Sequence, residues 1–260
     1  MLALVLFVGI DSFVEPYDVR LESFTIEARI ASPLTIIHLS DLHTNGYGLR
    51  EKRVVAMVEE TKPDLVVITG DVVDGGDLEP ARELLLKLHA PLGIFVVRGN
   101  WENWKPPPDE EGFYRSVNAK FLVNEGRLVR PDVWIAGTDD AMSGRADMAS
   151  ALRGAPARPS EPWHPAAPLR IALFHSPEWF DGIAKDIDVA FAGHTHGGQA
   201  RVPVLGPLWT PPGSGRFLEG WYQSGAARMF VSRGVGTSIL PVRFWCTPQV
   251  ARIVITPGRQ

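Results

Sequence analysis

Short apolar runs, each followed directly by a polar cluster, recur along this chain and predict a largely parallel β-sheet. The predicted strands cover residues 34–39, 64–69, 93–97, 169–174 and 188–191. Runs of about 4 to 8 apolar residues bounded by turn signals are typical of buried strands. Between the first three runs, the amphipathic patterns of residues 49–61 and 81–89 predict helices. Alternation of strand and helix predicts an α/β fold with its site at the carboxyl edge of the sheet.

Other segments predict further strands and exposed connections. Residues 120–136 hold three short apolar runs, which we assign to a second sheet. Residues 19–30 alternate apolar and polar positions, which predicts one or two half-exposed edge strands. Repeated prolines over residues 154–168 predict an exposed connector, and three consecutive prolines within residues 104–111 predict a loop at the rim of the site.

The N-terminus is treated as a separate segment. We divide the chain into residues 1–33, an apolar segment with edge strands, and residues 34–260, one α/β domain. Residues 1–10 carry no charge, but a spanning helix needs about 20 apolar residues. A basic start and a cleavage site, which define a secretory signal, are also missing from this run. Three interpretations stay open: the end of a membrane anchor that starts upstream, an interfacial anchor, or a buried strand or helix.

Composition narrows the functional classes. With 260 residues and 45% hydrophobic content, the chain can bury a sizeable core. The formal net charge of −4 and the lack of long basic runs argue against a general nucleic-acid binder. The single Cys246 excludes an internal disulfide framework and a cysteine-rich zinc site.

The polar clusters after the strands carry candidate metal ligands of one kind. These seven residues are Asp41, His43, Asp71, Asn100, His175, His194 and His196. Oxygen and nitrogen ligands without a thiolate suit Mn²⁺, Fe or Zn²⁺. Single Asp and Asn residues often cap helices or start turns, but seven such residues at five successive strand ends favour a site. Seven ligands are too many for one metal ion that keeps an open coordination position for substrate. They suit two metal ions that share one carboxylate.

Two of these histidines form a His-x-His pair. His194 and His196 follow the strand at residues 188–191 and are flanked by glycines. On an extended backbone, residues two apart point to the same side, so we expect both rings to face one spot. By contrast, His38 lies inside the first predicted strand and is expected to be a core histidine.

Charge balance favours phosphate chemistry at such a site. Two divalent ions carry four positive charges, of which Asp41 and Asp71 cancel two. The remaining two match a bridging hydroxide and a phosphodiester anion.

These motifs resemble those of the calcineurin-like metallophosphoesterases. The shared blocks, in the family's order, are Asp41-x-His43, Gly70-Asp71, Gly99-Asn100, an isolated His175 and Gly193-His194-x-His196. The resemblance runs from about residue 34 to the C-terminus. Blocks at residues 197–199, 231–236 and 241–244 look like the bacterial YaeI/YkuE-type branch. Members of that branch often carry an N-terminal membrane anchor or export signal, so we expect membrane association rather than a cytoplasmic location.

The resemblance implies a fold and a set of roles. The fold is a four-layer α/β/β/α sandwich of two mixed sheets, so residues 34–260 become the metallophosphoesterase domain. Asp71 bridges two divalent ions (Mn, Fe or Zn), and the other ligands divide between them. Asp41, His43 and His196 hold the first ion, and Asn100, His175 and His194 hold the second.

One position departs from the family's pattern. The usual block is Gly-Asn-His followed by an acid, and its histidine serves as the general acid. Here Trp101 stands in that place, and an indole N–H cannot transfer a proton at neutral pH. Glu102 keeps the acidic place and is expected to orient the loop. The expected catalytic group is therefore Asn100, Trp101, Glu102 and His194.

We expect a two-metal hydrolase that cleaves a phosphodiester or pyrophosphate bond by attack of a metal-bridging hydroxide. An amphiphilic or lipid-linked substrate is suggested by the N-terminal run and by tryptophans near the site or its rim. Those tryptophans are Trp101, Trp104, Trp209 and Trp221. The alternative for them is the protein core. Two other functions stay open: a nuclease or cyclic-nucleotide phosphodiesterase, and a metal-binding module that lost catalysis with its histidine. A nuclease would need a basic groove, which the charge distribution does not offer, so no nucleic-acid partner is expected.

Overall fold

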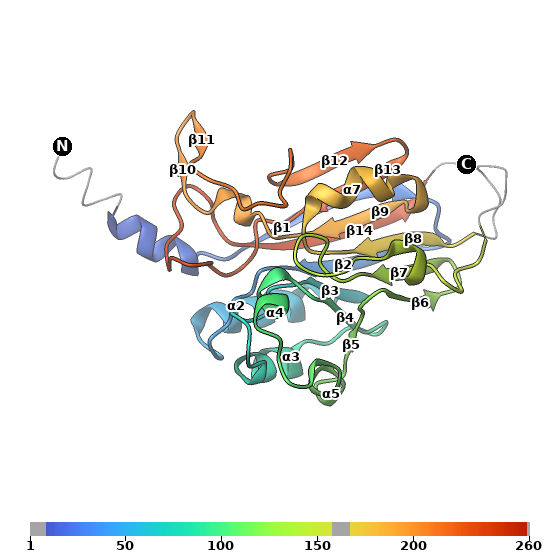
Figure 1. The fold of residues 1–260 in the computed structure, drawn as a ribbon, viewed down its shortest axis with the longest axis horizontal. Helices are drawn as coiled ribbons and strands as arrows, with labels where there is room; N and C mark the ends of the chain where they lie inside the picture. Colours follow the sequence, from blue (N-terminus) through green and yellow to red (C-terminus); the bar gives the residue numbers. More distant parts are fainter. Residues whose placement is uncertain (1–8, 158–166, 259–260) are drawn as a thin grey trace.

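Two mixed sheets form the centre of the protein (Figure 1). The computed structural model describes residues 9–157 and 167–258 of the chain. Within them each sheet has six strands, and β10 (Arg201–Val202) and β11 (Gly206–Pro207) form a small separate hairpin. The first sheet has the order β1 (Arg20–Ala28), β14 (Gln249–Pro257), β2 (Leu34–Leu39), β3 (Leu65–Thr69), β4 (Ile94–Val97) and β5 (Ala119–Phe121). The second has the order β12 (Gly220–Ser224), β13 (Ala227–Val231), β9 (Val189–Ala192), β8 (Leu169–Leu173), β7 (Val133–Gly137) and β6 (Glu125–Arg130).

Short helices connect these strands. The α-helices are α2 (Leu49–Thr61), α3 (Arg82–Lys87), α4 (Asn100–Trp104), α5 (Glu110–Ser116), α6 (Met148–Ala151) and α7 (Phe180–Ile183). The 3₁₀ turns are η1 (Glu15–Tyr17), η2 (Glu79–Ala81), η3 (Pro177–Trp179), η4 (Ala184–Asp186) and η5 (His196–Gly198).

Three hydrophobic clusters define four layers. Ile37 of β2 packs with Val54 and Leu84 of the helices on the outer face of the first sheet. Its neighbour Ile36 points to the other face and packs between the two sheets, because side chains alternate along a strand. A third cluster joins the second sheet to α6 and α7. Helix, sheet, sheet and helix follow one another, and the predicted four-layer α/β/β/α sandwich of two mixed sheets is confirmed.

The apolar patterns located most elements, with two corrections. Residues 120–136 do not all join the second sheet: β5 pairs in parallel with β4 of the first, and only β6 and β7 belong to the second. The reason is that α5 returns the chain to the edge of the first sheet before β5 begins. The predicted loop at residues 104–111 is also shorter, since α4 ends at Trp104 and α5 begins at Glu110.

The two ends of the chain meet in the first sheet. β1 lies at the sheet edge and pairs in parallel with β14 along its whole length. Residues 9–14 are helical, whereas residues 1–8 of the apolar run and 158–166 of the connector lie outside the described residues. None of the described helices has the length and apolar character that crossing a bilayer requires. The division of the chain at residue 33 stays a prediction.

Candidate metal centre

Five loops bring the predicted ligands together, and each loop directly follows a strand. Asp41 follows β2, Asp71 follows β3, Asn100 follows β4, His175 follows β8 and His194 follows β9. These strands are parallel within each sheet, so their carboxyl ends lie at one edge. All seven predicted ligands are buried, with exposed fractions of 6% or less.

The backbone is strained at five of these residues. Their φ angles are positive: 49° at Asp41, 41° at His43, 51° at Asp71, 70° at His194 and 49° at His196. Residues other than glycine rarely adopt the left-handed region, and such strain gathers at functional sites where the surrounding structure enforces it. The strained backbone of these loops is therefore consistent with side chains that are held in fixed positions for a function.

The predicted extended geometry of the His-x-His pair is wrong. β9 ends at Ala192, and His196 begins η5, so the chain turns between the two histidines. Gly193 permits this turn beside the first sheet, because a Cβ there would collide with Ser40 Oγ. As a result, the two rings face two neighbouring groups of ligands.

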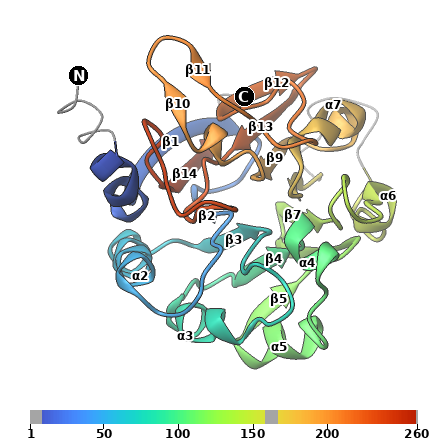
Figure 2. The same cartoon turned by 60° about the vertical axis from the view of Figure 1, so that its left-hand side comes forward.

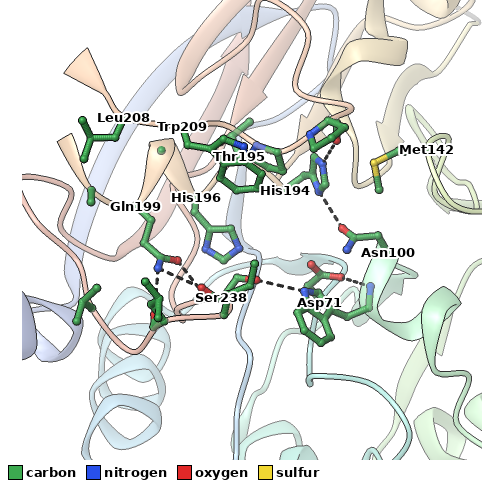
Figure 3. Close-up of a pocket in the computed structure, with 18 of the residues that line it drawn as sticks. Asp71, Asn100, Met142, His194, Thr195, His196, Gln199, Leu208, Trp209 and Ser238 are labelled. Carbon is green, nitrogen blue, oxygen red and sulfur yellow. Dashed lines mark hydrogen bonds between the residues drawn. The ribbon is translucent and has the colours of Figure 1, made fainter. Parts of the chain in front are cut away.

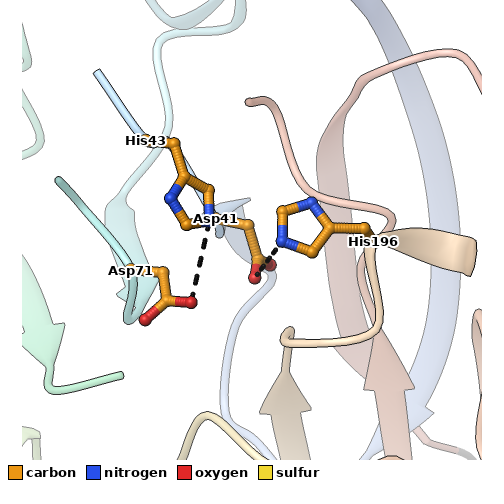
Figure 4. Close-up of side chains that lie close together, drawn as sticks. All are labelled: Asp41, His43, Asp71 and His196. Carbon is orange, nitrogen blue, oxygen red and sulfur yellow. Dashed lines mark ion pairs between the residues drawn. The ribbon is translucent and has the colours of Figure 1, made fainter. Parts of the chain in front are cut away.

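The first group contains Asp41, His43, Asp71 and His196 (Figure 4). One ligand atom from each lies within 4.8 Å of the others. His196 Nε2 is 3.4 Å from Asp41 Oδ1, and His43 Nε2 is 3.7 Å from Asp71 Oδ2. The rings of His43 and His196 stack with their centroids 5.1 Å apart.

The second group contains Asp71, His175 and His194, again within 4.8 Å of one another. Asn100 Oδ1 joins it, at 3.0 Å from His175 Nε2 and 2.8 Å from His194 Nδ1. Figure 3 shows the contact between Asn100 and His194. Asp71 belongs to both groups: its Oδ1 accepts the Trp101 N–H at 3.0 Å, and its Oδ2 lies 3.2 Å from His175 Nε2. Of the seven predicted ligands, only Asp71 occurs in both groups.

Hydrogen bonds on the far side of the His175 and His194 rings leave one nitrogen of each ring directed into the site. His175 Nδ1 donates to the Thr69 carbonyl at 2.7 Å, and His194 Nε2 donates to the Pro212 carbonyl at 2.6 Å. The free nitrogens of these two rings then lie 3.2 Å apart. His43 Nε2 is buried and has no hydrogen-bond partner among the described residues. Converging lone pairs without a donor fit a bound cation, so the residues present suit a pair of divalent ions.

The electrostatics of the site favour positive charge between the two aspartates. Burial raises the pKa of Asp71, but the charge and hydrogen bond of His175, the charge of His43 and the Trp101 N–H together outweigh burial and hold that pKa below its usual value. Burial lowers the pKa of His194 and of His196, which keeps both rings neutral and able to ligate. For His43, burial is outweighed by the hydrogen bond to Asp74 and by Asp71, and its pKa is raised. A metal ion would replace such protons on binding.

Trp101 and Glu102 have different surroundings. The Glu102 carboxylate is buried and accepts the N–H groups of Gly99, Asp71 and Val72 at 2.7–3.0 Å. Burial and the nearby Asp71 raise the pKa of Glu102 to about 7. The Trp101 ring lies edge-on to His43 at 5.9 Å, and its Nε1 donates to Ser238 Oγ at 3.3 Å. Glu102 thus braces the ligand loops, while Trp101 lies beside the first group of ligands.

Sequence reasoning missed the groups that orient the histidines. Asp74 Oδ1 lies 2.7 Å from His43 Nδ1 and fixes that ring. Carboxylates in this place raise the basicity of a ligating imidazole. Asp74 follows Asp71 by three residues, but nothing in the sequence pairs it with His43. The carbonyls of Thr69 and Pro212 carry no sequence signal at all.

A cavity of about 480 Å³ opens over the ligands (Figure 3). Asp71, Asn100, His194 and His196 form its floor. Its walls are mainly apolar: Trp101, Trp104, Met142, Leu208, Trp209, Pro211, Pro212, Ile239, Leu240 and Val242. Among the described residues, no Lys or Arg lines it. Trp221 is not part of it, since this ring packs against Phe230 at 5.3 Å, and its expected place near the site is wrong.

Comparisons with known proteins agree with this geometry. The model of the family described as calcineurin-like phosphoesterase matches residues 34–198, which include all seven predicted ligands. The metallophosphoesterase YkuE of Bacillus subtilis is 31% identical over 93% of this chain and 87% of its own length. A metallophosphoesterase of Aquifex aeolicus is 30% identical over 95% of both chains. The phosphodiesterase YaeI of Escherichia coli is 27% identical over 86% of this chain and 82% of its own.

Proposed function

Since the chain belongs to the calcineurin-like phosphoesterase family, we propose that it uses two divalent ions to hydrolyse a phosphodiester or pyrophosphate bond in an amphiphilic, lipid-linked substrate. The observation that carries this proposal is one cavity with metal ligands on its floor and apolar side chains on its walls. The polar floor suits the phosphate, and the walls suit an apolar substituent.

The seven ligands divide between the two ions as the two groups of side chains do. Asp41, His43 and His196 hold one ion, Asn100, His175 and His194 hold the other, and Asp71 bridges them. Nitrogen and oxygen donors without a thiolate suit Mn²⁺, Fe or Zn²⁺. When bound, two such ions lower the pKa of water and stabilise the attacking and leaving oxygens.

The walls argue for a substrate with little charge outside the reacting phosphodiester or pyrophosphate. No wall residue offers a cation to a sugar acid or to a phosphate remote from the floor. Trp101, Trp104 and Trp209 instead offer flat apolar surfaces beside the floor. A phosphodiester with an acyl or alkyl substituent matches this arrangement, and such a substrate agrees with the membrane association expected from the sequence.

The leaving group is constrained by Trp101. Its indole N–H is held by Ser238 Oγ and cannot supply a proton. Esters of acidic alcohols and phosphoanhydrides, whose leaving oxygens need no proton, are therefore the preferred substrates.

The test is an assay of the full chain after metal removal and reloading with Mn²⁺, Fe²⁺ or Zn²⁺. Substrates are an aryl phosphodiester with a long alkyl group, its methyl analogue, an aryl monoester, a cyclic nucleotide and single-stranded DNA. The proposal expects the amphiphilic diester to be hydrolysed fastest. Faster turnover of the cyclic nucleotide or DNA would replace it with the nucleotide alternative.

Trp101 also favours a second candidate, a metal-binding module without catalysis. For both the hydrolase and the metal-binding module, we expect each chain to bind two equivalents of metal. Uptake of two ions without turnover of any activated diester would favour the module, so metal content and rate are measured on the same sample.

A further inference from the structure

Exposed apolar side chains gather around the mouth of the cavity. We call this surface the apolar rim and define it by Val204, Leu205, Leu208, Trp209, Ile239 and Leu240. Their exposed fractions run from 60% at Trp209 to 103% at Val204. The last four of these residues also line the cavity over the ligands, and Val204 and Leu205 form the turn of the β10–β11 hairpin. The rim therefore surrounds the site and extends outward from it.

The backbone holds two rim residues outward at a cost. Val204 has φ 72° and Ile239 has φ 64°, and both are β-branched residues in the left-handed region. Such a conformation is a genuine outlier for β-branched residues and is unfavourable. Neither side chain gains burial within the chain in return. An apolar partner outside the chain would supply that burial.

The N-terminal helix continues the rim. The Arg243 N–H donates to the Ser12 carbonyl at 2.9 Å, which fixes residues 9–14 beside the loop that carries Ile239. Ile10 and Phe13 are 65% and 60% exposed on this helix. Figures 1 and 2 show the helix and the β10–β11 hairpin at the same end of the molecule. In the sequence, residues 1–8 lead into this helix without a charged side chain.

Exposed apolar side chains are scarce on the rest of the described surface. Leu86 on α3 and Leu128 on β6 are each 50% exposed, and Figure 1 shows β6 at the opposite end of the molecule from the β10–β11 hairpin. Leu49 lines a cleft together with Tyr17 and Ile239, so it belongs to the same end. Soluble proteins rarely expose contiguous apolar patches of this kind unless the patch binds something.

We propose that the apolar rim docks on the surface of a lipid bilayer, so that the metal centre opens toward the lipid headgroups. A protein partner or a second copy on this face would cover the mouth of the cavity and shut out substrate. A bilayer can cover the same mouth because it is itself a source of amphiphilic phosphodiesters. Aliphatic tips for the acyl region and tryptophans such as Trp209 and Trp245 for the headgroup region fit such an interface. The choice of a bilayer as the partner and the delivery of substrate rest on the proposed function, whereas the exposure of the apolar rim does not.

The test measures sedimentation of the full-length, metal-loaded protein with vesicles of phosphatidylcholine, with and without phosphatidylglycerol. The variant is Val204→Glu/Leu205→Glu, whose side chains lie outside the cavity lining. Its matched control, Leu86→Glu/Leu128→Glu, adds the same charge at the two remote apolar positions. Because the rim variant loses two aliphatic side chains that would be buried in the bilayer, we expect it to bind vesicles at least about tenfold more weakly. The control should bind as the unsubstituted protein does.

Two results would overturn the docking. One is that the unsubstituted protein does not sediment with either kind of vesicle. The other is that both double variants bind vesicles as well as the unsubstituted protein does. Light scattering shows whether the protein is a dimer. If the protein is a dimer that does not bind vesicles, and Val204→Glu/Leu205→Glu dissociates it, the apolar rim belongs to the contact with a second copy instead. Circular dichroism and thermal unfolding check that the variants are folded. Because binding is measured by sedimentation and not by turnover, an inactive protein that binds vesicles would refute the proposed function alone.

Discussion

The floor and the rim of the cavity are built in opposite ways. On the floor, Asp71 and Asn100 are polar and no more than 3% exposed, and hydrogen bonds from surrounding loops fix their positions. At the rim, Val204 and Ile239 are apolar and at least 79% exposed. Both regions reverse the usual distribution of polar and apolar residues. The reversal on the floor fits ion binding, and the reversal at the rim fits contact with an apolar partner.

Removing the centre of the floor should have the largest effect. Asp71→Ala takes away the proposed bridge, and we expect loss of both ions and a fall in turnover of roughly a thousandfold or more, since metal catalysis is worth several kcal/mol. His43→Ala, as the comparison, should weaken one ion more than the other. Metal analysis and rates on the same samples check this. Two tightly held ions in Asp71→Ala would show that Asp71 is no bridge.

Trp101 lies where the floor meets the wall, and its replacement should change leaving-group dependence. A general acid contributes about 10²- to 10⁴-fold, so Trp101→His should raise kcat/KM for alkyl diesters by at least about 10²-fold and flatten its dependence on leaving-group pKa. Trp104→His, at the neighbouring ring, serves as the control and should keep the steep dependence. Equal slopes for all three proteins would mean that another residue supplies the proton.

Asp74 is not one of the seven predicted metal ligands, but it orients one of them, His43. Asp74→Asn removes the carboxylate from His43 Nδ1 and should weaken the affinity for one ion about 10- to 100-fold. Glu60→Gln, an exposed change on α2, controls for the lost charge. Competition with a metal indicator measures both affinities. Unchanged affinity in Asp74→Asn would leave this hydrogen bond without a role in metal binding.

His38 offers a comparison with the floor, as a buried histidine outside both groups of ligands. Its Nε2 lies 2.8 Å from Thr69 Oγ1, and burial lowers its pKa to about 3 from a usual 6.5. As the pH falls, His38 therefore takes up a proton at a higher pH in the unfolded chain than in the folded protein. The stability that neutral His38 contributes is present above pH 6.5 and is lost as pH falls toward 3.

His38→Gln should reduce this acid loss, because glutamine keeps a donor for Thr69 and does not titrate. Urea unfolding at pH 7.5 and pH 4.5 measures the difference, which should be smaller than in the unsubstituted protein by about 1–3 kcal/mol. His89→Gln, at an exposed histidine, should change nothing. An identical acid loss in all three proteins would remove His38 as its source.

The sequence predicted the floor much better than the rim. β2 and α2 match their predicted bounds because a run of apolar residues and a helical period are local signals. The ligands could be grouped because parallel strands end at one edge. Sheet membership was harder: the run that forms β5 is apolar in either sheet, and only the path through α5 decides. The left-handed turn at His194 depends on packing of Gly193 against Ser40, which no local pattern records.

The apolar rim has no recognisable pattern in the sequence because its residues come from separate loops. Val204, Leu208 and Ile239 are scattered along the sequence, and each alone is an ordinary loop residue. They become a surface only when β10–β11 and the 237–245 loop lie beside the same cavity. Prolines and glycines mark these segments as loops and carry no information on where their side chains point.

In the proposed function, one cavity binds a phosphodiester by its floor and an apolar chain by its walls. The most direct measurement is kcat/KM for 4-nitrophenyl alkyl phosphodiesters from methyl to dodecyl, at concentrations below micelle formation, with the metal-loaded protein. Burial of each methylene is worth about 0.8 kcal/mol at most, so we predict a rise of about two- to fourfold for each added carbon until the walls are covered. Rates that stay flat or fall along the series would contradict the claim.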